Sequence, residues 1–152
     1  MRILRNTGCY LLLLLLTTGI QATAQSAKGT GKWKAEQLIS PEILAARIQS
    51  GEAANMLILN TGPVEDIPGA VHIGEVEKSA NVKKLARFLD DQPRDKEIVI
   101  YCGCCPLSGC PNIEPAYKKL AQMKFTNFKI LNMPQDLQED WIDKGYPMPA
   151  KK

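Results

Sequence analysis

The sequence predicts one α/β domain with a five-stranded, mainly parallel sheet and helices on both faces. The clearest observation is the stretch Glu97–Cys102, where five apolar or aromatic residues follow a charged one, as in a strand buried on both faces. Ile113–Ala121 then carries apolar residues at i, i+3, i+4, i+7 and i+8, which is the face of a helix. Strand-like and helix-like stretches alternate elsewhere too, which favours a parallel sheet.

The stretches before residue 97 predict three strands and two helices. Ser40 and Pro41 are typical of a helix start, and Gly51 is a suitable C-cap. The second helix presents apolar residues on one face and basic residues on the other. The expected elements are a strand within 35–39, a helix from 41 to about 50, a strand at 56–59, a short strand within 67–73 and a helix at 79–90.

Three elements are expected after the strand at 97–102. The first is a helix from about 112 to 123, in which Pro115 is tolerated because it falls in the first turn. A fifth strand follows at 128–131. A last helix starts at Pro134 and ends at Gly145.

The first 24 residues have the organisation of a secretory signal peptide. Arg2 and Arg5 form a basic start, 10–16 is an apolar run too short to span a membrane, and 22–24 is a small-residue cleavage signal. We therefore predict a signal peptide at 1–24, a flexible leader at 25–34 and the domain at 35–150. The mature protein is expected in the periplasm or outside the cell, with no membrane attachment.

The charge balance of the chain does not favour a polyanionic partner. The chain has 19 basic and 16 acidic residues, and cleavage of the signal peptide leaves 17 against 16. Such a balance indicates neither a nucleic-acid partner nor an anionic membrane surface. We predict no resident cofactor and no assigned metal, and the oligomeric state stays open.

Four cysteines lie within nine positions, starting at the end of the strand expected at 97–102. Cysteines that cross-link a scaffold are spread along the chain, so this clustering indicates a site. The carboxyl end of a parallel strand next to a helix N-terminus is where α/β sheets bind ligands, and the helix dipole there favours a thiolate. The candidate nucleophile is Cys102, and the candidate active-site loop comprises Gly103, Cys104, Cys105, Pro106, Leu107, Ser108, Gly109 and Cys110.

Three separated stretches form a recognisable set: Ile67–Ile73 (IPGAVHI), Ile98–Cys102 (IVIYC) and Trp141 with the following Gly145-Tyr146-Pro147. In this order they resemble the rhodanese-like sulfurtransferase family. Together they span roughly residues 36–148. The resemblance implies a rhodanese-like fold and an enzyme that carries sulfur as a persulfide on Cys102. Its partners would be a small sulfur donor and a thiophilic acceptor, and backbone N–H groups of the loop would hold the charge.

The chain departs from the family's pattern in three places. The loop after Cys102 is longer than the family's compact cradle, and 103–112 contains no Arg or Lys that would hold thiosulfate. The second strand ends in Leu59-Asn60-Thr61, where the family commonly has Asp-Val-Arg.

At a helix N-terminus the pKa of Cys102 is expected below the ordinary value of about 8.5.

The other cysteines leave alternatives open. Cys105 lies five residues before Cys110, about the length of a compact cradle, so Cys105 is a rival nucleophile. Cys104, Cys105 and Cys110 are also candidates for redox chemistry or for a disulfide such as Cys105–Cys110. The alternative function is therefore a thiol–disulfide protein, or one that binds Cu(I) or Zn(II) through its thiolates, on the same fold.

Overall fold

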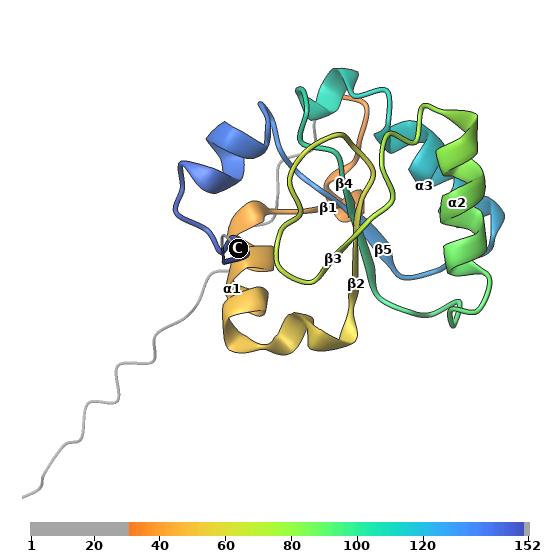
Figure 1. Cartoon of the computed structure of the whole chain (residues 1–152), viewed down its shortest axis with the longest axis horizontal. Helices are drawn as coiled ribbons and strands as arrows, with labels where there is room; N and C mark the ends of the chain where they lie inside the picture. The colour runs from red at the N-terminus through yellow and green to blue at the C-terminus, as the bar shows by residue number, and fades with distance from the viewer. Residues whose placement is uncertain (1–30, 151–152) are drawn as a thin grey trace, which may run out of the picture.

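Five strands form one sheet in the order β1-β5-β4-β2-β3, and every pair of neighbours is parallel (Figure 1). This confirms the predicted α/β class. The computed structural model describes residues 31–150, so the predicted signal peptide at 1–24 and positions 25–30 of the leader lie outside it. The strands are β1 (Leu38–Ile39), β2 (Leu57–Asn60), β3 (Ala70–His72), β4 (Ile98–Tyr101) and β5 (Phe128–Leu131).

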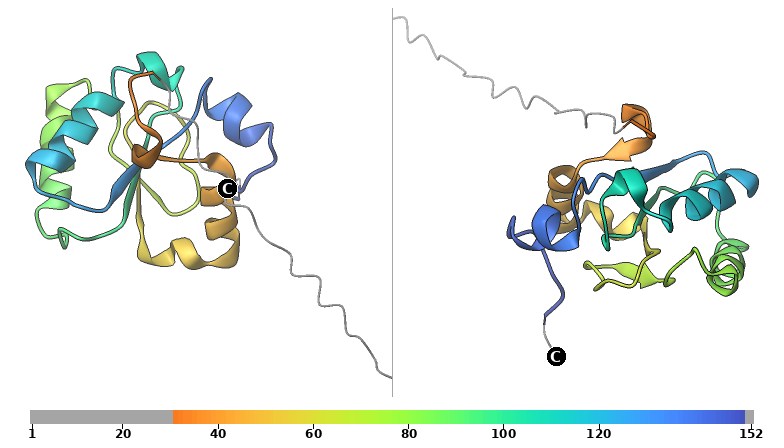
Figure 2. Two further views of the ribbon diagram at one scale, coloured as in Figure 1. Left: turned by 180° about the vertical axis from the view of Figure 1, so that it is seen from behind. Right: turned by 90° about the horizontal axis from the view of Figure 1, so that it is seen from above.

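Helices cover both faces of the sheet. Helices α2 (Ser79–Leu89) and α3 (Ile113–Gln122) lie on one face, and α1 (Pro41–Ser50) lies on the other with a π-helical turn at Gln138–Ile142 (Figures 1 and 2). Short 3-10 turns occupy Ala35–Gln37, Glu52–Asn55 and Leu107–Gly109. No helix within residues 31–150 has the length and apolar character needed to cross a membrane.

The predicted boundaries hold for α1 and shift for the last helix. The Ser40 hydroxyl accepts a hydrogen bond from the Ile43 amide, and Gly51 ends α1 in the left-handed conformation, as expected. The last helix begins at Gln138 rather than at Pro134. The reason is local, because the Asp136 carboxylate accepts a hydrogen bond from the Glu139 amide and so holds the preceding residues outside the helix.

The sheet separates two apolar cores. One lies under α2 and α3 and includes Ile100, Leu120 and Cys102, while the other lies under α1 and is centred on the fully buried Trp141. Trp33 also belongs to the first core, where its ring contacts Tyr117 with 5.0 Å between centroids. The packing of Trp33 therefore starts the core two residues before the predicted domain boundary at 35.

β4 lies in the middle of the sheet, and this position fixes the end of the strand. All four of its residues are buried. The Tyr101 carbonyl accepts hydrogen bonds from the Thr61 amide (2.7 Å) and hydroxyl (2.8 Å). The Tyr101 hydroxyl accepts from the Ile67 amide at 3.0 Å. Residues just after β4 therefore leave the sheet from a rigid point, and the first of them is Cys102.

Candidate functional site: a four-cysteine loop after β4

Cys102 is nearly fully buried at the carboxyl end of β4, with 1% of its surface exposed. The chain turns at once, because Gly103 adopts φ +72°. A Cβ at Gly103 would lie 2.9 Å from the Cβ of Leu137, so this position requires glycine for its conformation and for space. The Gly103 carbonyl accepts the Leu137 amide at 2.9 Å, which ties the turn to the segment after β5.

Gly62 packs directly against the candidate nucleophile. It follows β2, the strand that pairs with β4. A Cβ added to Gly62 would lie 2.6 Å from both the carbonyl oxygen and the sulfur of Cys102. Only glycine therefore lets the β2 loop approach this sulfur without displacing it.

The loop is pinned to the body of the domain by its own backbone. The Leu107 amide donates to the Met133 carbonyl at 3.1 Å, and the Leu107 side chain is buried. The amides of Gly109 and Cys110 donate to the carbonyls of Pro106 and Leu107. These three amides are therefore committed elsewhere, which corrects the expectation that backbone donors throughout 103–110 surround the sulfur of Cys102.

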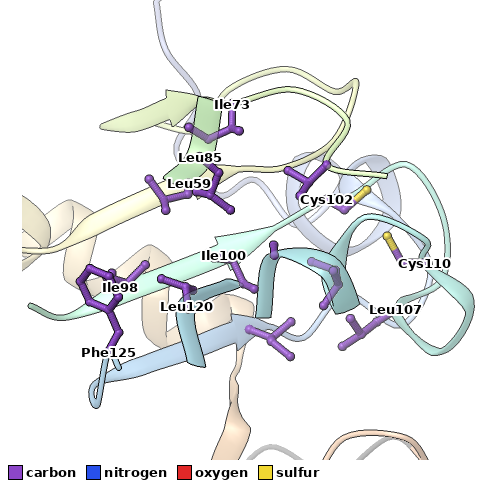
Figure 3. Close-up of a cluster of buried hydrophobic side chains, with 14 of the residues drawn as sticks. Leu59, Ile73, Leu85, Ile98, Ile100, Cys102, Leu107, Cys110, Leu120 and Phe125 are labelled. Atoms are coloured by element: carbon purple, nitrogen blue, oxygen red, sulfur yellow. The ribbon is translucent and has the colours of Figure 1, made fainter. Parts of the chain in front are cut away.

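The four thiols nevertheless gather at one place. The sulfur of Cys102 lies 3.1 Å from that of Cys104, and Cys104 lies 3.5 Å from Cys105. Cys102, Cys104 and Cys110 have all three sulfurs within 4.8 Å of one another. Figure 3 shows Cys102 and Cys110 at the same end of the sheet. All four cysteines are free thiols, so the redox and disulfide roles stay predictions.

Asn112 is a functional candidate that sequence reasoning missed. Its side-chain amide donates to the sulfur of Cys102 at 3.3 Å, and the residue is 2% exposed. Its carbonyl oxygen accepts the Glu77 amide at 3.0 Å, which turns the NH₂ group towards the sulfur. Asn112 precedes α3 but makes no side-chain cap bond. The only signal in the sequence is its position at the expected start of the helix, which does not indicate a thiol partner.

The surroundings raise the pKa of Cys102 above its ordinary value, contrary to the expected lowering. The first cause is the hydrogen bond with the neighbouring Cys110 thiol, and the second is burial, which disfavours the charged form. The Cys104 amide opposes both by donating to the sulfur. The balance of these contributions favours the neutral thiol form of reduced Cys102 at pH 7.

The rival nucleophile Cys105 is no better activated. It is partly buried, and desolvation followed by the Cys104 thiol raises its pKa to about 11. Partial desolvation of its thiol also raises the pKa of Cys104, although the residue as a whole is exposed. The three thiols therefore differ in access to solvent more than in their charge at neutral pH.

Access to the site differs sharply on its two sides. A cavity of about 10 Å³ borders Cys102, Cys105, Cys110 and Met133, which is room for roughly one water molecule. An open groove of about 490 Å³ lies beside Cys104 and includes the carboxylates of Glu65 and Asp136. A reagent that fills the groove therefore meets Cys104 and not Cys102.

His72, the only histidine, is engaged away from these thiols. Its Nδ1 lies 3.0 Å from an Asp66 carboxylate oxygen and 3.2 Å from the amide nitrogen of Asn60. The same Asp66 oxygen also accepts a hydrogen bond from the side-chain NH₂ group of Asn60 at 2.9 Å. The three side chains brace the loop between β2 and β3, in agreement with a structural role for His72.

The raised pKa values predict a particular alkylation pattern. Cys104 should react first with iodoacetamide, because it is exposed, and Cys102 should be the most protected. Since the pKa of Cys105 is about 11, its alkylation rate should climb with pH, about tenfold per unit, from pH 7 to pH 10. Peptide mass spectrometry at each pH measures both effects. A Cys105 or Cys102 rate that is already constant at pH 8 would contradict these pKa shifts.

The order of the five parallel strands and the helices on both faces of the sheet match a rhodanese-like α/β fold. A solved structure similar to this chain is the rhodanese-like domain of the Alr3790 protein from Anabaena sp., determined by solution NMR. The TM-score is 0.50 at 16% sequence identity, and the match covers 76% of this chain and 86% of that one. No family model and no curated protein matches the sequence.

Proposed function

We propose that this protein is a sulfane-sulfur carrier or sulfurtransferase that holds sulfur as a persulfide on Cys102. The observation that carries the proposal is the placement of Cys102 at the end of β4, within 3.1 Å of the exposed Cys104 thiol and 3.3 Å of the Asn112 amide. The first contact supplies a partner for sulfur exchange. The second supplies a fixed donor for the negative charge that develops on a persulfide.

Because Cys102 is buried, sulfur reaches it through Cys104. The donor is a small persulfide, RSSH. The Cys104 sulfur attacks the outer sulfur of RSSH, the S–S bond of the donor breaks, and the thiol proton of Cys104 passes to the departing sulfur, so that RSH leaves. The outer sulfur is now bound to Cys104 as a persulfide, and no net oxidation or reduction has occurred. The open groove gives the donor access to Cys104 for this step.

The second step moves the same sulfur atom inward. The sulfur of Cys102 attacks the outer sulfur of the Cys104 persulfide, and the bond to Cys104 breaks. The thiol proton of Cys102 passes to the departing Cys104 sulfur, which lies 3.1 Å away. The transfer therefore needs no free thiolate in the buried position, which fits the raised pKa of Cys102.

The charge around the groove disfavours thiosulfate as the donor. Glu65 and Asp136 both line the groove, and 103–112 carries no basic residue. A dianion beside two carboxylates is repelled. A small persulfide carries at most one negative charge, so it is repelled less. The acceptor is a thiophilic molecule that enters by the same route.

The proposal is tested by the intact mass of the reduced wild-type chain. After incubation with a small persulfide and desalting, we expect one additional sulfur atom per chain, and cyanide, a thiophilic acceptor, should remove it. Thiosulfate at the same concentration should load the chain far more slowly. A chain that gains no sulfur, or whose added sulfur resists cyanide, would contradict the proposal.

Thiol–disulfide exchange is a second candidate, favoured by the 3.1 Å separation of Cys102 and Cys104. In this reaction an oxidised disulfide RSSR accepts two electrons from the two thiols, which form a Cys102–Cys104 bond and release two RSH. Counting thiols after treatment with oxidised glutathione distinguishes the candidates. Two thiols lost per chain support exchange, whereas thiols that stay free with oxidised glutathione, in a chain that retains one sulfur after treatment with the small persulfide, support the carrier.

A further inference from the structure

Three sulfurs converge at the end of β4 in an arrangement that sulfur carriage does not need. Cys102 closes the strand, Cys104 follows in the turn, and Cys110 ends the loop. Their sulfurs all lie within 4.8 Å of one another. Transfer between Cys104 and Cys102 uses only two of them. The third, Cys110, is 5% exposed and is held facing this point by the Leu107 turn.

The three sulfurs are surrounded by further sulfur atoms and by apolar side chains. The adjoining cavity is bordered by a further thiol, Cys105, by the thioether-bearing Met133 and by apolar side chains. Among the described residues no carboxylate and no imidazole borders this cavity. Thiolate and thioether ligands select Cu(I) over the hard cations, which require oxygen ligands.

The number of protein ligands at this site favours Cu(I) over Zn(II). A structural zinc site is closed by four protein ligands in a tetrahedron. Three cysteine sulfurs form the group here, and Cys105, whose sulfur lies 3.5 Å from that of Cys104, stands outside it. The adjoining cavity has room for about one water molecule. Cu(I) is satisfied by two or three sulfur ligands and needs no water. Cys102 and Cys110 border the cavity, and Cys104 completes the group of three from the side of the open groove.

We propose that Cys102, Cys104 and Cys110 form a binding site for one Cu(I) ion. Binding is a ligand exchange without change of oxidation state: the ion leaves its carrier ligand, bonds form to the cysteine sulfurs, and the displaced thiol protons go to solvent. Because the ion occupies Cys102, copper and a persulfide exclude one another. The inference does not depend on the proposed sulfur carriage, since binding is measured without any sulfur donor.

The test uses the reduced protein, residues 25–152, under anaerobic conditions with Cu(I) supplied as its bicinchoninate complex. The wild type should remove one copper per chain from the chelator, and X-ray absorption should show sulfur as the only ligand type. Cys104→Ser and Cys110→Ser should each weaken binding by about 100-fold or more. Cys105→Ser tests whether the fourth thiol takes part, and binding should persist because its sulfur lies outside the group of three.

Circular dichroism of each variant shows whether it folds, and alkylation of the folded wild type provides an independent readout. One equivalent of Cu(I) should protect Cys104, the thiol that is otherwise the most exposed. Copper that stays with the chelator would overturn the proposal. So would binding that is lost in Cys105→Ser but kept in Cys110→Ser, or a chain that binds Zn(II) through these sulfurs and leaves Cu(I) behind.

Discussion

Replacing Gly62 by alanine is expected to displace the sulfur of Cys102 and to reduce persulfide loading by about 100-fold. The added Cβ would lie 2.6 Å from both the sulfur and the carbonyl oxygen of Cys102. The sulfur can rotate away, but the carbonyl belongs to the backbone at the end of a central strand and cannot. We therefore also expect a loss of about 1–3 kcal/mol in the free energy of unfolding.

Gly109→Ala is the matched control for this substitution. A Cβ at Gly109 meets no atom within 4 Å, and its φ lies outside the left-handed region. Its amide donates to Pro106 and not to the site. Urea unfolding and persulfide loading, measured on both variants, check the prediction. A Gly62→Ala protein that loads sulfur as fast as Gly109→Ala would show that the close approach of Gly62 is unimportant.

Replacing Cys102 by serine is expected to abolish stable persulfide storage. The serine oxygen cannot accept a sulfane sulfur, and Cys104 alone holds the sulfur where solvent and acceptors reach it. The fold should survive, because the exchanged atom is small and the Asn112 amide, now 3.3 Å from sulfur, can donate to the hydroxyl instead. The retained sulfur after desalting should therefore fall from about one per chain to nearly none.

Cys105→Ser provides the comparison for this variant, because Cys105 makes no contact with the sulfur of Cys102 among the hydrogen bonds of the described residues. It should keep its persulfide. If Cys105→Ser loses storage while Cys102→Ser retains it, the rival assignment of the nucleophile to Cys105 is correct. Thermal unfolding of both variants distinguishes loss of chemistry from loss of fold.

The fold could be predicted because its signals are local. The apolar run at 97–102 and the helical spacing after Ile113 each depend on residues close in sequence. The α1 boundaries followed from Ser40, Pro41 and Gly51 in the same way. The predicted start of the last helix was four residues too early. The Asp136 carboxylate accepts a hydrogen bond from the Glu139 amide, and this contact keeps the residues before it outside the helix.

The site was less predictable because its decisive contacts join distant segments. Gly62 reaches Cys102 from another strand, and the orientation of Asn112 is set by the Glu77 amide. Neither contact leaves a pattern in the sequence. The expected lowering of the Cys102 pKa failed for a related reason: the helix N-terminus was visible in the sequence, but the depth of burial and the neighbouring Cys110 thiol were not.

The most direct test of the account is to locate the added sulfur in the wild-type chain during a single loading with a limiting amount of small persulfide. Samples are trapped with an alkylating agent at successive times, digested and sequenced by mass spectrometry. We predict a persulfide that appears first on Cys104 and then accumulates on Cys102. Sulfur that accumulates on Cys105 or Cys110, with Cys102 unmodified throughout, would contradict the account.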